Sequence, residues 1–379
     1  MRFTWAWAWV IGCGCLCAAG PRGLSVNDAG ELRRNGGPYT GVGVNYYDAF
    51  VRTLGPSDRT DYEAGFRELT QRKIPFVRFS AGGYWPADWR LYQTNRVEYF
   101  ARFDRLVHCA ERQGIGLIPS LFWQLSTIPD LVGEPCRRWG DTNSLTHAFL
   151  RTYTREVVTR YAQSPAIWAW EFGNEYNLAA DLPNAAEHRP PVVPSLGTPD
   201  RRTKEDEVTH AQVREAVRAF AQEVRRHDAD RLILSGHAFP RNSAWHQMQR
   251  GSWERDTPEQ FARVLAEDNP GPVNSLSVRA YDAASDLPRL AAAMEVARVA
   301  RKPIFVGEFG VPGADTPASR AQFAAILQAL ATNRVPLAAL WVFDFDSQAA
   351  DWNVTATNGR GWQLDAVQRA NELREKAGR

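Results

Sequence analysis

Apolar residues along this chain follow two spacings that alternate from residue 24 to the last residue. Short, continuous apolar runs are typical of strands that are buried on both faces. The longer stretches between them repeat an apolar residue every three or four positions, which is typical of amphipathic helices. No linker, low-complexity tract or fixed-period repeat interrupts the alternation. The pattern therefore predicts one domain, over 24–379, built from repeated βα units.

The short apolar runs predict eight strands. They are expected at 41–46, 75–80, 116–121, 167–172, 231–235, 275–281, 303–308 and 337–343. Helical patterns lie between and after them, at 61–72, 96–113, 143–163, 206–227, 258–267, 287–300, 317–332 and 364–377. Eight strands that are each followed by a helix close naturally into a (β/α)8 TIM barrel, and 379 residues are enough for one such domain.

Polar and aromatic residues stand where these strands end. A barrel of this kind is filled with packed side chains, so its active site forms at the carboxyl ends of the strands and in the loops that follow. The segment 183–203, rich in proline and polar residues, is expected to form a lid or rim there. We expect the strand-end residues to open into one pocket: Asn45, Arg78, Trp123, Asn174, Glu175, His237, Tyr281, Glu308 and Trp341.

Two of the predicted strands deliver a glutamate to this face. Glu175 follows Gly173-Asn174 at the end of one strand, and Glu308 ends another. Cleavage of a glycosidic bond with retention needs a carboxylic acid and a nucleophilic carboxylate held about 5–5.5 Å apart. The fourth and seventh strands face each other across a barrel, so glutamates at their ends can meet that spacing. The alternative is that each is a surface glutamate beside a glycine turn.

These segments give the chain a resemblance to the clan-A glycoside hydrolases, and among them to the cellulases and mannanases of family five. The resemblance implies a retaining mechanism in which Glu175 is the acid/base and Glu308 is the nucleophile. Beyond this pair, the stretch from Leu24-Ser25-Val26 to Gly41–Asn45 resembles the family's entry strand. Val77-Arg78-Phe79 resembles its second strand, and Leu340-Trp341 resembles its eighth.

The resemblance also implies roles for other strand-end residues. Arg78 would bond the nucleophile and keep it ionised, with a structural salt bridge as the alternative. Asn174 would donate to the sugar 2-hydroxyl, an interaction that strengthens in the transition state. Tyr281 would hydrogen-bond the nucleophile. Trp341 would lie under the sugar at the cleavage point, unless it is only a core residue.

Other residues near this face are candidates for substrate binding. Asn45 is expected in the same pocket, and His237 is expected to be either a hydrogen-bonded wall residue or a substrate contact. Tryptophans in or near the upper loops present aromatic faces that can stack on sugar rings. These are Trp85, Trp89, Trp123, Trp245 and Trp352.

The sequence departs from the family pattern in two places. Many members carry His-x-Tyr on the sixth strand, where this chain has Arg279-Ala280-Tyr281. The family's histidine on the third or fourth strand is also missing, because Ser120-Leu121-Phe122-Trp123 stands there. These departures leave the two glutamates untouched. They weaken any transfer of substrate specificity, so glucan and mannan both stay open.

The net charge and the cysteine content of the sequence limit which partners and cofactors we expect the protein to bind. A net charge of +2, with no block of basic residues, gives no reason to expect nucleic acid or an anionic membrane surface. A neutral oligo- or polysaccharide fits better, and we expect a monomer. No Cys/His set has metal-ligand spacing, so neither a metal nor another cofactor is expected. Cys109 and Cys136 are predicted to lie at opposite faces of the barrel and therefore to be unpaired.

The first residues have the pattern of an export signal. Arg2 is followed by an apolar stretch and by small residues at 18–20. We expect residues 1–20 to be a signal peptide, too short to span a membrane, and the protein to be secreted or periplasmic. The stretch 10–13 also resembles a lipoprotein cleavage box, so a lipid anchor on Cys13 is the alternative.

Together these patterns predict an exported retaining β-glycoside hydrolase that acts on a β-linked glucan or mannan. The alternative from another class is a non-catalytic carbohydrate-binding barrel or a structural protein of the cell surface, since a fold does not fix a function. Such a protein would be expected to lack the acid or the nucleophile, whereas this sequence retains both glutamates.

Overall fold

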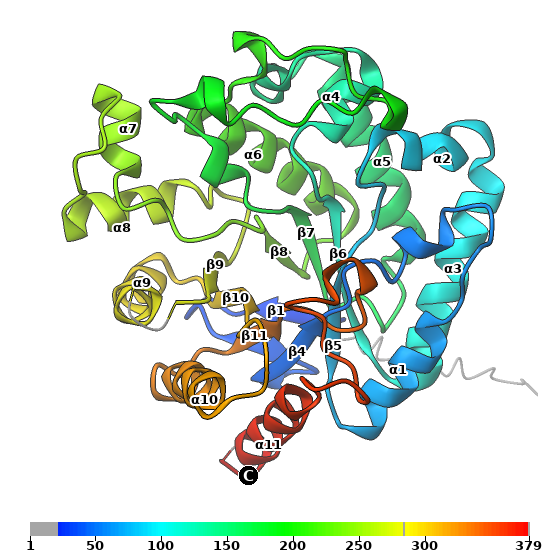
Figure 1. Ribbon diagram of the computed structural model, residues 1–379, viewed down its shortest axis with the longest axis vertical. Coiled ribbons are helices and arrows are strands. Elements are labelled where there is room, and N and C mark those ends of the chain that lie inside the picture. Colours follow the sequence, from blue (N-terminus) through cyan, green and yellow to red (C-terminus); the bar gives the residue numbers. More distant parts are fainter. Residues whose placement is uncertain (1–21, 283–284, 378–379) are drawn as a thin grey trace, which may run out of the picture.

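A single parallel sheet forms the centre of the computed structural model, which describes residues 22–282 and 285–377 (Figure 1). Its eight strands are hydrogen-bonded in the order β8-β7-β6-β5-β4-β11-β10-β9. In chain order they are β4 (Gly41–Asn45), β5 (Phe76–Ser80), β6 (Gly116–Phe122), β7 (Ala169–Gly173), β8 (Leu232–Leu234), β9 (Leu276–Ala280), β10 (Ile304–Phe309) and β11 (Leu337–Leu340). The predicted (β/α)8 barrel is therefore confirmed.

Side chains complete the barrel where β8 and β9 meet. The amide of Ile233 on β8 donates to Asn274 Oδ1 at 2.8 Å, and Ser275 Oγ donates to the Ile233 carbonyl at 3.1 Å. Farther along, the Gly236 amide donates to Ser277 Oγ at 3.2 Å. These bonds satisfy backbone groups that would otherwise be buried without partners, so the seam needs no regular ladder.

A helix follows each barrel strand, as the spacing of apolar residues predicted. The helices that cover the sheet are α1 (Tyr62–Gln71), α3 (Arg96–Gln113), α5 (Leu145–Tyr161), α6 (His210–His227), α8 (Pro258–Glu267), α9 (Asp286–Ala300), α10 (Pro317–Thr332) and α11 (Trp362–Ala377). Several begin later than predicted because a polar residue caps them. Ser144 accepts from the His147 amide at the start of α5, and Thr209 accepts from the Gln212 amide at the start of α6.

Three shorter helices lie in the loops at the carboxyl ends of the strands and were not predicted. They are α2 (Arg90–Thr94), α4 (Thr127–Val132) and α7 (Ala244–Arg250). Each is too brief to show a helical period in the sequence, since two turns hold only one or two apolar repeats. One of them, α2, lines the cavity described below with Arg90, Leu91 and Thr94.

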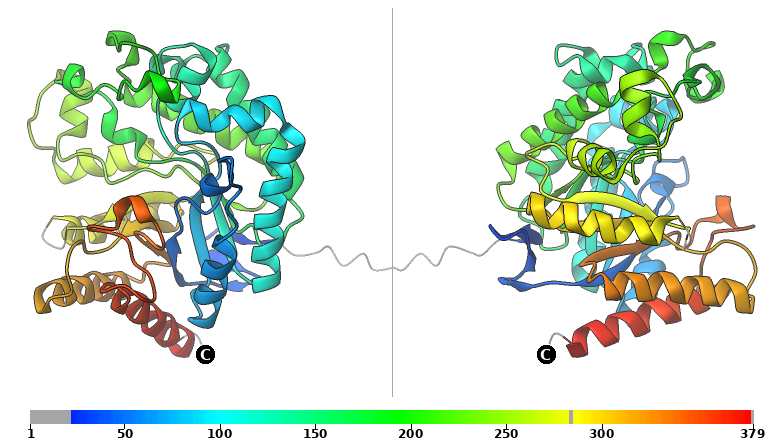
Figure 2. Two further views of the ribbon diagram at one scale, coloured as in Figure 1. Left: turned by 45° about the vertical axis from the view of Figure 1, so that its right-hand side comes forward. Right: turned by 90° about the vertical axis from the view of Figure 1, so that its left-hand side faces the viewer.

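A small antiparallel sheet closes the amino-terminal end of the barrel. It consists of β1 (Leu24–Val26), β2 (Leu32–Arg34) and β3 (Gly37–Pro38). The Leu24 amide donates to the Trp168 carbonyl at 2.8 Å, and both side chains belong to an apolar cluster under the barrel. The resemblance had suggested that Leu24–Val26 belongs to the first barrel strand. This prediction is wrong, because Leu24–Val26 forms β1 of the separate small sheet. Figure 2 shows this sheet, in blue, at the opposite end from the loop after β11.

Several expectations concern the chain outside the barrel strands. Cys109 and Cys136 are both buried and free, which agrees with the predicted absence of a bridge between them. Residues 1–20 and Cys13 lie outside the described residues. Within 22–282 and 285–377, no helix is long and apolar enough to cross a membrane.

The segment 183–203 is fastened to its surroundings as a rim. Arg202 forms two bonds with Asp130 on α4, from Nη1 to Oδ1 at 2.6 Å and from Nη2 to Oδ2 at 2.7 Å. Both side chains are almost fully buried, with 4% and 1% exposed. Nearer the start of the segment, Arg189 Nε donates to Glu207 Oε1 at 2.9 Å. The segment lies on the same side of the barrel as α4 (Figure 1).

Breaking the buried pair should destabilise the protein. Asp130→Ala leaves the Arg202 guanidinium buried with only Asp206, 3.6 Å away, as a charged neighbour. We expect the free energy of unfolding to fall by about 3 kcal/mol, near the lower end for a broken buried pair. Urea unfolding measures this, with Glu295→Ala at the exposed Arg298 pair as a control that should be neutral. Equal stability of the two variants would contradict an anchored rim.

Candidate active site

Glu308 lies at the carboxyl end of β10 with donors around both of its oxygens. Arg78 Nη1 donates to Oε1 at 2.8 Å, and Tyr281 Oη donates to Oε2 at 2.6 Å. The Nε atom of Arg279 lies 3.3 Å from Oε1. Only 5% of the side chain is exposed. Because both oxygens accept bonds, the arrangement fits a carboxylate whose position is fixed on every side.

Arg78, on β5, is the centre of this network and is completely buried. Its Nε donates to Glu171 Oε2 at 2.6 Å, and its Nη1 donates to Asn45 Oδ1 at 2.9 Å as well as to Glu308. Its Nη2 donates to Asn174 Oδ1 at 2.8 Å. One guanidinium therefore joins side chains from β4, β7 and β10 with the residue that follows β7.

Glu175 faces the same space from the turn after β7. Its backbone is left-handed, with φ of 55°, and its amide donates to the Gly236 carbonyl at 3.0 Å. Burial raises the pKa of Glu175 to about 7, and the charge of Glu308 adds to this rise, while Arg279 and Arg78 oppose it. The side chain is nevertheless 31% exposed. Glu175 can therefore carry a proton near neutral pH and exchange it with the cavity.

Arg279 lies between the two glutamates. Its Nε atom is 3.3 Å from Glu308 Oε1 and 3.8 Å from Glu175 Oε1. The two oxygens are therefore at most about 7 Å apart, a limit that is compatible with the roughly 5–5.5 Å separation of retaining pairs. A protonated acid and an ionised carboxylate can thus act on the same bond.

A cavity of about 1250 Å³ opens above these groups. Of the predicted residues, those that line it are Trp123, Asn174, Glu175, Tyr281, Glu308 and Trp341. Asn45 and Arg78 lie beneath its floor, where both are fully buried. The structure thus brings these eight strand-end residues together around one site.

His237 is the exception among the predicted residues. It is 1% exposed and does not line the cavity, because Gly236, with φ of 77°, turns the chain before it. Burial lowers the pKa of His237 to about 4, so the ring is neutral. Its two ring nitrogens have no hydrogen-bond partner in the described part of the chain. Its carbonyl accepts from Arg279 Nη1 at 3.3 Å.

Aromatic rings cover one side of the cavity. Trp341 and Trp123 lie nearly parallel, with ring centroids 6.1 Å apart, and Trp341 Nε1 donates to Gln348 Oε1 at 2.8 Å. Trp123 also lies over the Arg78 guanidinium at 4.3 Å. Trp341 is partly exposed, so it is not only a core residue. A sugar ring in the cavity can stack against these faces.

The other tryptophans that were predicted near this face separate into two groups. Trp85 and Trp352 line the cavity. Trp89 is fully buried in the core beneath them, and Trp245 lies away from the cavity on α7. For Trp89, the prediction of a sugar-binding face is wrong, because its indole packs against Tyr153 with centroids 4.8 Å apart.

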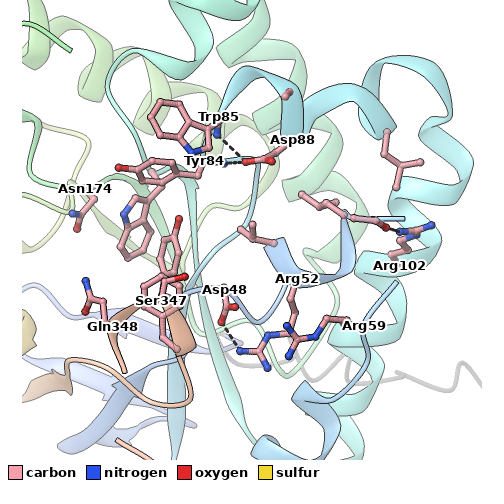
Figure 3. Close-up of a pocket in the computed structure, with 18 of the residues that line it drawn as sticks. Asp48, Arg52, Arg59, Tyr84, Trp85, Asp88, Arg102, Asn174, Ser347 and Gln348 are labelled. Carbon is pink, nitrogen blue, oxygen red and sulfur yellow. Dashed lines mark hydrogen bonds and ion pairs between the residues drawn. The ribbon is translucent and has the colours of Figure 1, made fainter. Parts of the chain in front are cut away.

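One part of the cavity extends between η1 (Val51–Thr53) and η2 (Pro86–Trp89). Asp88 accepts from the Tyr84 and Trp85 amides at 3.0 and 2.8 Å, and Asp48 accepts from Arg52 Nη2 at 2.6 Å (Figure 3). Burial raises the pKa of both aspartates. Carboxylates and aromatic rings facing a groove suit the hydroxyls and C–H faces of sugars.

A smaller cavity of about 240 Å³ adjoins the main one on the other side of Asn174. It shares Tyr84 and Trp123 with the main cavity and reaches His188 and Pro190 on the rim segment. Space for a chain molecule therefore continues from the main cavity past Asn174 toward the rim segment.

Two charged residues of the site were not singled out from the sequence, namely Glu171 and Arg279. Both lie within barrel strands, two residues before Gly173 and Tyr281 respectively, where side chains alternate between barrel interior and helix layer. A charged residue inside an otherwise apolar run was the available signal. A buried charge needs a partner, so each of them pointed to a second charge within the barrel.

Comparisons with known proteins agree with this geometry. A family model for cellulase (glycosyl hydrolase family 5) matches residues 40–347. Mannan endo-1,4-beta-mannosidase A of Podospora anserina is 38% identical over 80 residues, which cover 20% of this chain and 21% of that protein. Probable mannan endo-1,4-beta-mannosidase C of Aspergillus terreus is 35% identical over 103 residues, 24% of this chain and 25% of that protein. The matched stretch is thus at most a quarter of either relative.

Solved structures resemble the chain over nearly its whole length. The endo-1,4-beta-mannanase from Rhizomucor miehei has a TM-score of 0.67 at 15% identity, covering 93% of this chain and 99% of that one. A beta-glucanase from Saccharophagus degradans, in complex with cellotetraose, has a TM-score of 0.57 at 15% identity, covering 95% and 94%. At such low identity the likeness shows a shared fold. The family match extends over well more than half of the sequence, and the chain therefore belongs to glycosyl hydrolase family 5.

Proposed function

We propose that the protein is a retaining β-glycoside hydrolase that cleaves a β-linked mannan within the chain. The observation that carries the proposal is the pair of glutamates at one cavity. Glu308 accepts from Arg78 and Tyr281, whereas the pKa of Glu175 is raised to about 7. A carboxylate beside a carboxylic acid is what a double displacement on a glycoside requires.

In the first step the Glu175 proton passes to the glycosidic oxygen as the bond from that oxygen to the anomeric carbon breaks. The Glu308 carboxylate attacks the same carbon from the opposite face and forms a glycosyl ester. In the second step Glu175, now ionised, removes a proton from water, and the resulting hydroxide displaces Glu308. Two inversions leave the anomeric configuration unchanged.

Asn174 is placed to bind the sugar in this reaction. Its Oδ1 accepts from Arg78 Nη2 at 2.8 Å and from Arg279 Nη2 at 2.9 Å. The amide nitrogen has no hydrogen-bond partner in the described part of the chain, and the residue lines the cavity. We infer that this nitrogen donates to the 2-hydroxyl of the sugar attacked by Glu308, while Trp341 stacks on its ring.

The form of the cleft supports a polymeric substrate and cleavage within the chain. The main cavity, at about 1250 Å³, exceeds the usual range for a small ligand, and the second cavity continues beyond Asn174. Mannan is favoured over glucan by the names of the relatives. A glucan is the second candidate, because a beta-glucanase shares the fold. A non-catalytic barrel is not favoured, since Glu175 and Glu308 both line one cavity.

Export belongs to the same proposal. The charged start of the chain, the apolar stretch and the small residues at 18–20 support a signal peptide at 1–20, with a lipid anchor on Cys13 as the alternative. We further propose that the mature protein acts as a monomer.

The substrate can be tested directly with the purified protein. Soluble β-1,4-mannan and β-1,4-glucan are incubated with enzyme, and reducing ends and product lengths are followed. We expect faster release from mannan and early products of several sugars, because the main cavity is large and a second cavity continues beyond Asn174. Faster release from glucan would move the substrate to the second candidate, and a single sugar as the only early product would contradict internal cleavage.

The pH profile tests Glu175 as the acid. The acid form must donate a proton, so kcat/KM should fall about tenfold per pH unit once the pH exceeds the raised pKa of about 7. Glu175→Gln cannot donate a proton and should lose this basic limb along with most activity. Constant kcat/KM from pH 6 to 9 in the wild type would argue against this role.

Separate substitutions distinguish the two glutamates. Glu308→Ala should abolish turnover and trapping by a 2-deoxy-2-fluoro glycoside, because no attacking group remains. Glu175→Ala should still be glycosylated by a dinitrophenyl glycoside, whose leaving group needs no proton, and azide should restore turnover. Poor leaving groups should lose about 10²–10⁴-fold. The azide product should keep the starting configuration, and an inverted product would overturn the assignment.

A further inference from the structure

Arg279 fits into a space that β10 leaves for it. Beside β9 the register of β10 shifts between Val306 and Glu308, so that Arg279 pairs with Glu308 and Gly307 is the extra residue of a bulge. A Cβ atom on Gly307 would lie 2.2 Å from Arg279 Nη1. Only glycine therefore allows the guanidinium to pass over β10 toward the cavity.

Backbone oxygens hold the guanidinium in place from one side. Its Nη2 donates to the Gly236 carbonyl at 2.8 Å, and its Nη1 donates to the carbonyls of Val278 and His237 at 3.2 and 3.3 Å. These bonds use the donors that point away from the site. The side chain is 4% exposed, so its position is set by the barrel and not by solvent.

The remaining donors of Arg279 face Asn174 and the two glutamates. Nη2 also donates to Asn174 Oδ1 at 2.9 Å, and Nε lies 3.3 Å from Glu308 Oε1 and 3.8 Å from Glu175 Oε1. Nε has no hydrogen-bond partner by geometry in the described part of the chain. Arg279 is thus in reach of the proposed nucleophile, the proposed acid and the amide that faces the sugar.

We propose that Arg279 is a positioning residue that turns the Asn174 amide toward the sugar and places one positive charge between Glu175 and Glu308. The inference rests on the proposed two-step mechanism and adds a residue to it. Arg279 works through these neighbours and makes no bond to the substrate itself. Arg78 cannot replace it, because that guanidinium is also bound to Glu171.

The charges around Glu175 and Glu308 determine how removal of Arg279 should change their protonation. The groups that face the two glutamates are Arg78 from β5, Glu171 from β7, Tyr281 after β9 and the neutral His237 after β8. Without Arg279, one guanidinium would remain for three carboxyl groups. Glu175 would then bind a proton more readily, because Arg279 lowers the pKa of Glu175 and a cation within about 4–6 Å lowers the pKa of a carboxyl by about 1–3.

The pH profile of Arg279→Met tests this prediction, because methionine removes the charge but keeps much of the volume. We expect the basic limb of the kcat/KM profile on an aryl glycoside, which reports Glu175, to move to higher pH by about one unit or more. Arg289→Met, which removes another partly buried arginine beyond the site, is the control and should leave both limbs in place. An unmoved basic limb in folded Arg279→Met would overturn the inference.

A lysine at the same position separates charge from geometry and serves if the methionine variant does not fold. Arg279→Lys keeps the charge, so the basic limb should stay near its wild-type pH, but an ammonium cannot bond Asn174 and face both carboxyls at once. The wild type should prefer a glycoside with a 2-hydroxyl over its 2-deoxy analogue, and this preference should drop at least tenfold in the variant. An unchanged preference would contradict the positioning of Asn174.

The experiments distinguish a failure of the Arg279 proposal from a failure of the proposed two-step mechanism. If Glu308→Ala retained turnover, the proposed mechanism would fail before Arg279 is considered. If that variant is inactive while Arg279→Met keeps the wild-type profile and Arg279→Lys keeps the 2-hydroxyl preference, only the role of Arg279 fails.

Discussion

The burial of the Arg78 guanidinium is the constraint on which the site depends. A cation without partners inside a barrel is very costly, so each of its donors must be satisfied. They are satisfied by side chains from three strands and from the turn after β7, namely Asn45, Glu171, Glu308 and Asn174. The bonds that make the buried charge tolerable also fix Glu308, the proposed nucleophile. Stability and function therefore depend on the same contacts at this end of the barrel, whereas the opposite end is closed by apolar packing.

The sequence was sufficient to predict the barrel, because its apolar runs and amphipathic stretches each have a period that matches one kind of element. It also placed most of the site, since residues at strand ends meet at one face of a parallel barrel. What it missed depends on backbone detail. His237 ends a strand, yet the left-handed Gly236 keeps its ring out of the cavity. Arg279 enters the site only because β10 bulges at Gly307. Neither the left-handed conformation of Gly236 nor the bulge at Gly307 leaves a periodic pattern in the sequence from which it could be predicted.

Charge balance explains why two similar glutamates differ. The barrel interior holds two guanidiniums, Arg78 and Arg279, and two carboxylates that bond Arg78 directly, Glu171 and Glu308. Glu175 is a third carboxyl group with no cation of its own, and its nearest charged nitrogen is 3.8 Å away. A proton on this residue restores neutrality, which agrees with the raised pKa. The raised pKa of Glu175 thus arises first from its burial and then from the charge of Glu308, which Arg279, 3.8 Å away, and Arg78 do not offset.

In the proposed mechanism, the second half of the reaction accounts for the exposure of Glu175. A residue that only donated a proton once could be sealed in the core, as Glu171 is. A residue that must next remove a proton from incoming water needs a path to solvent while it remains partly desolvated. Its left-handed backbone and its 31% exposed side chain at the cavity wall provide both conditions. Glu308 stays 5% exposed, because a nucleophile has to meet only the anomeric carbon and gains from being held still.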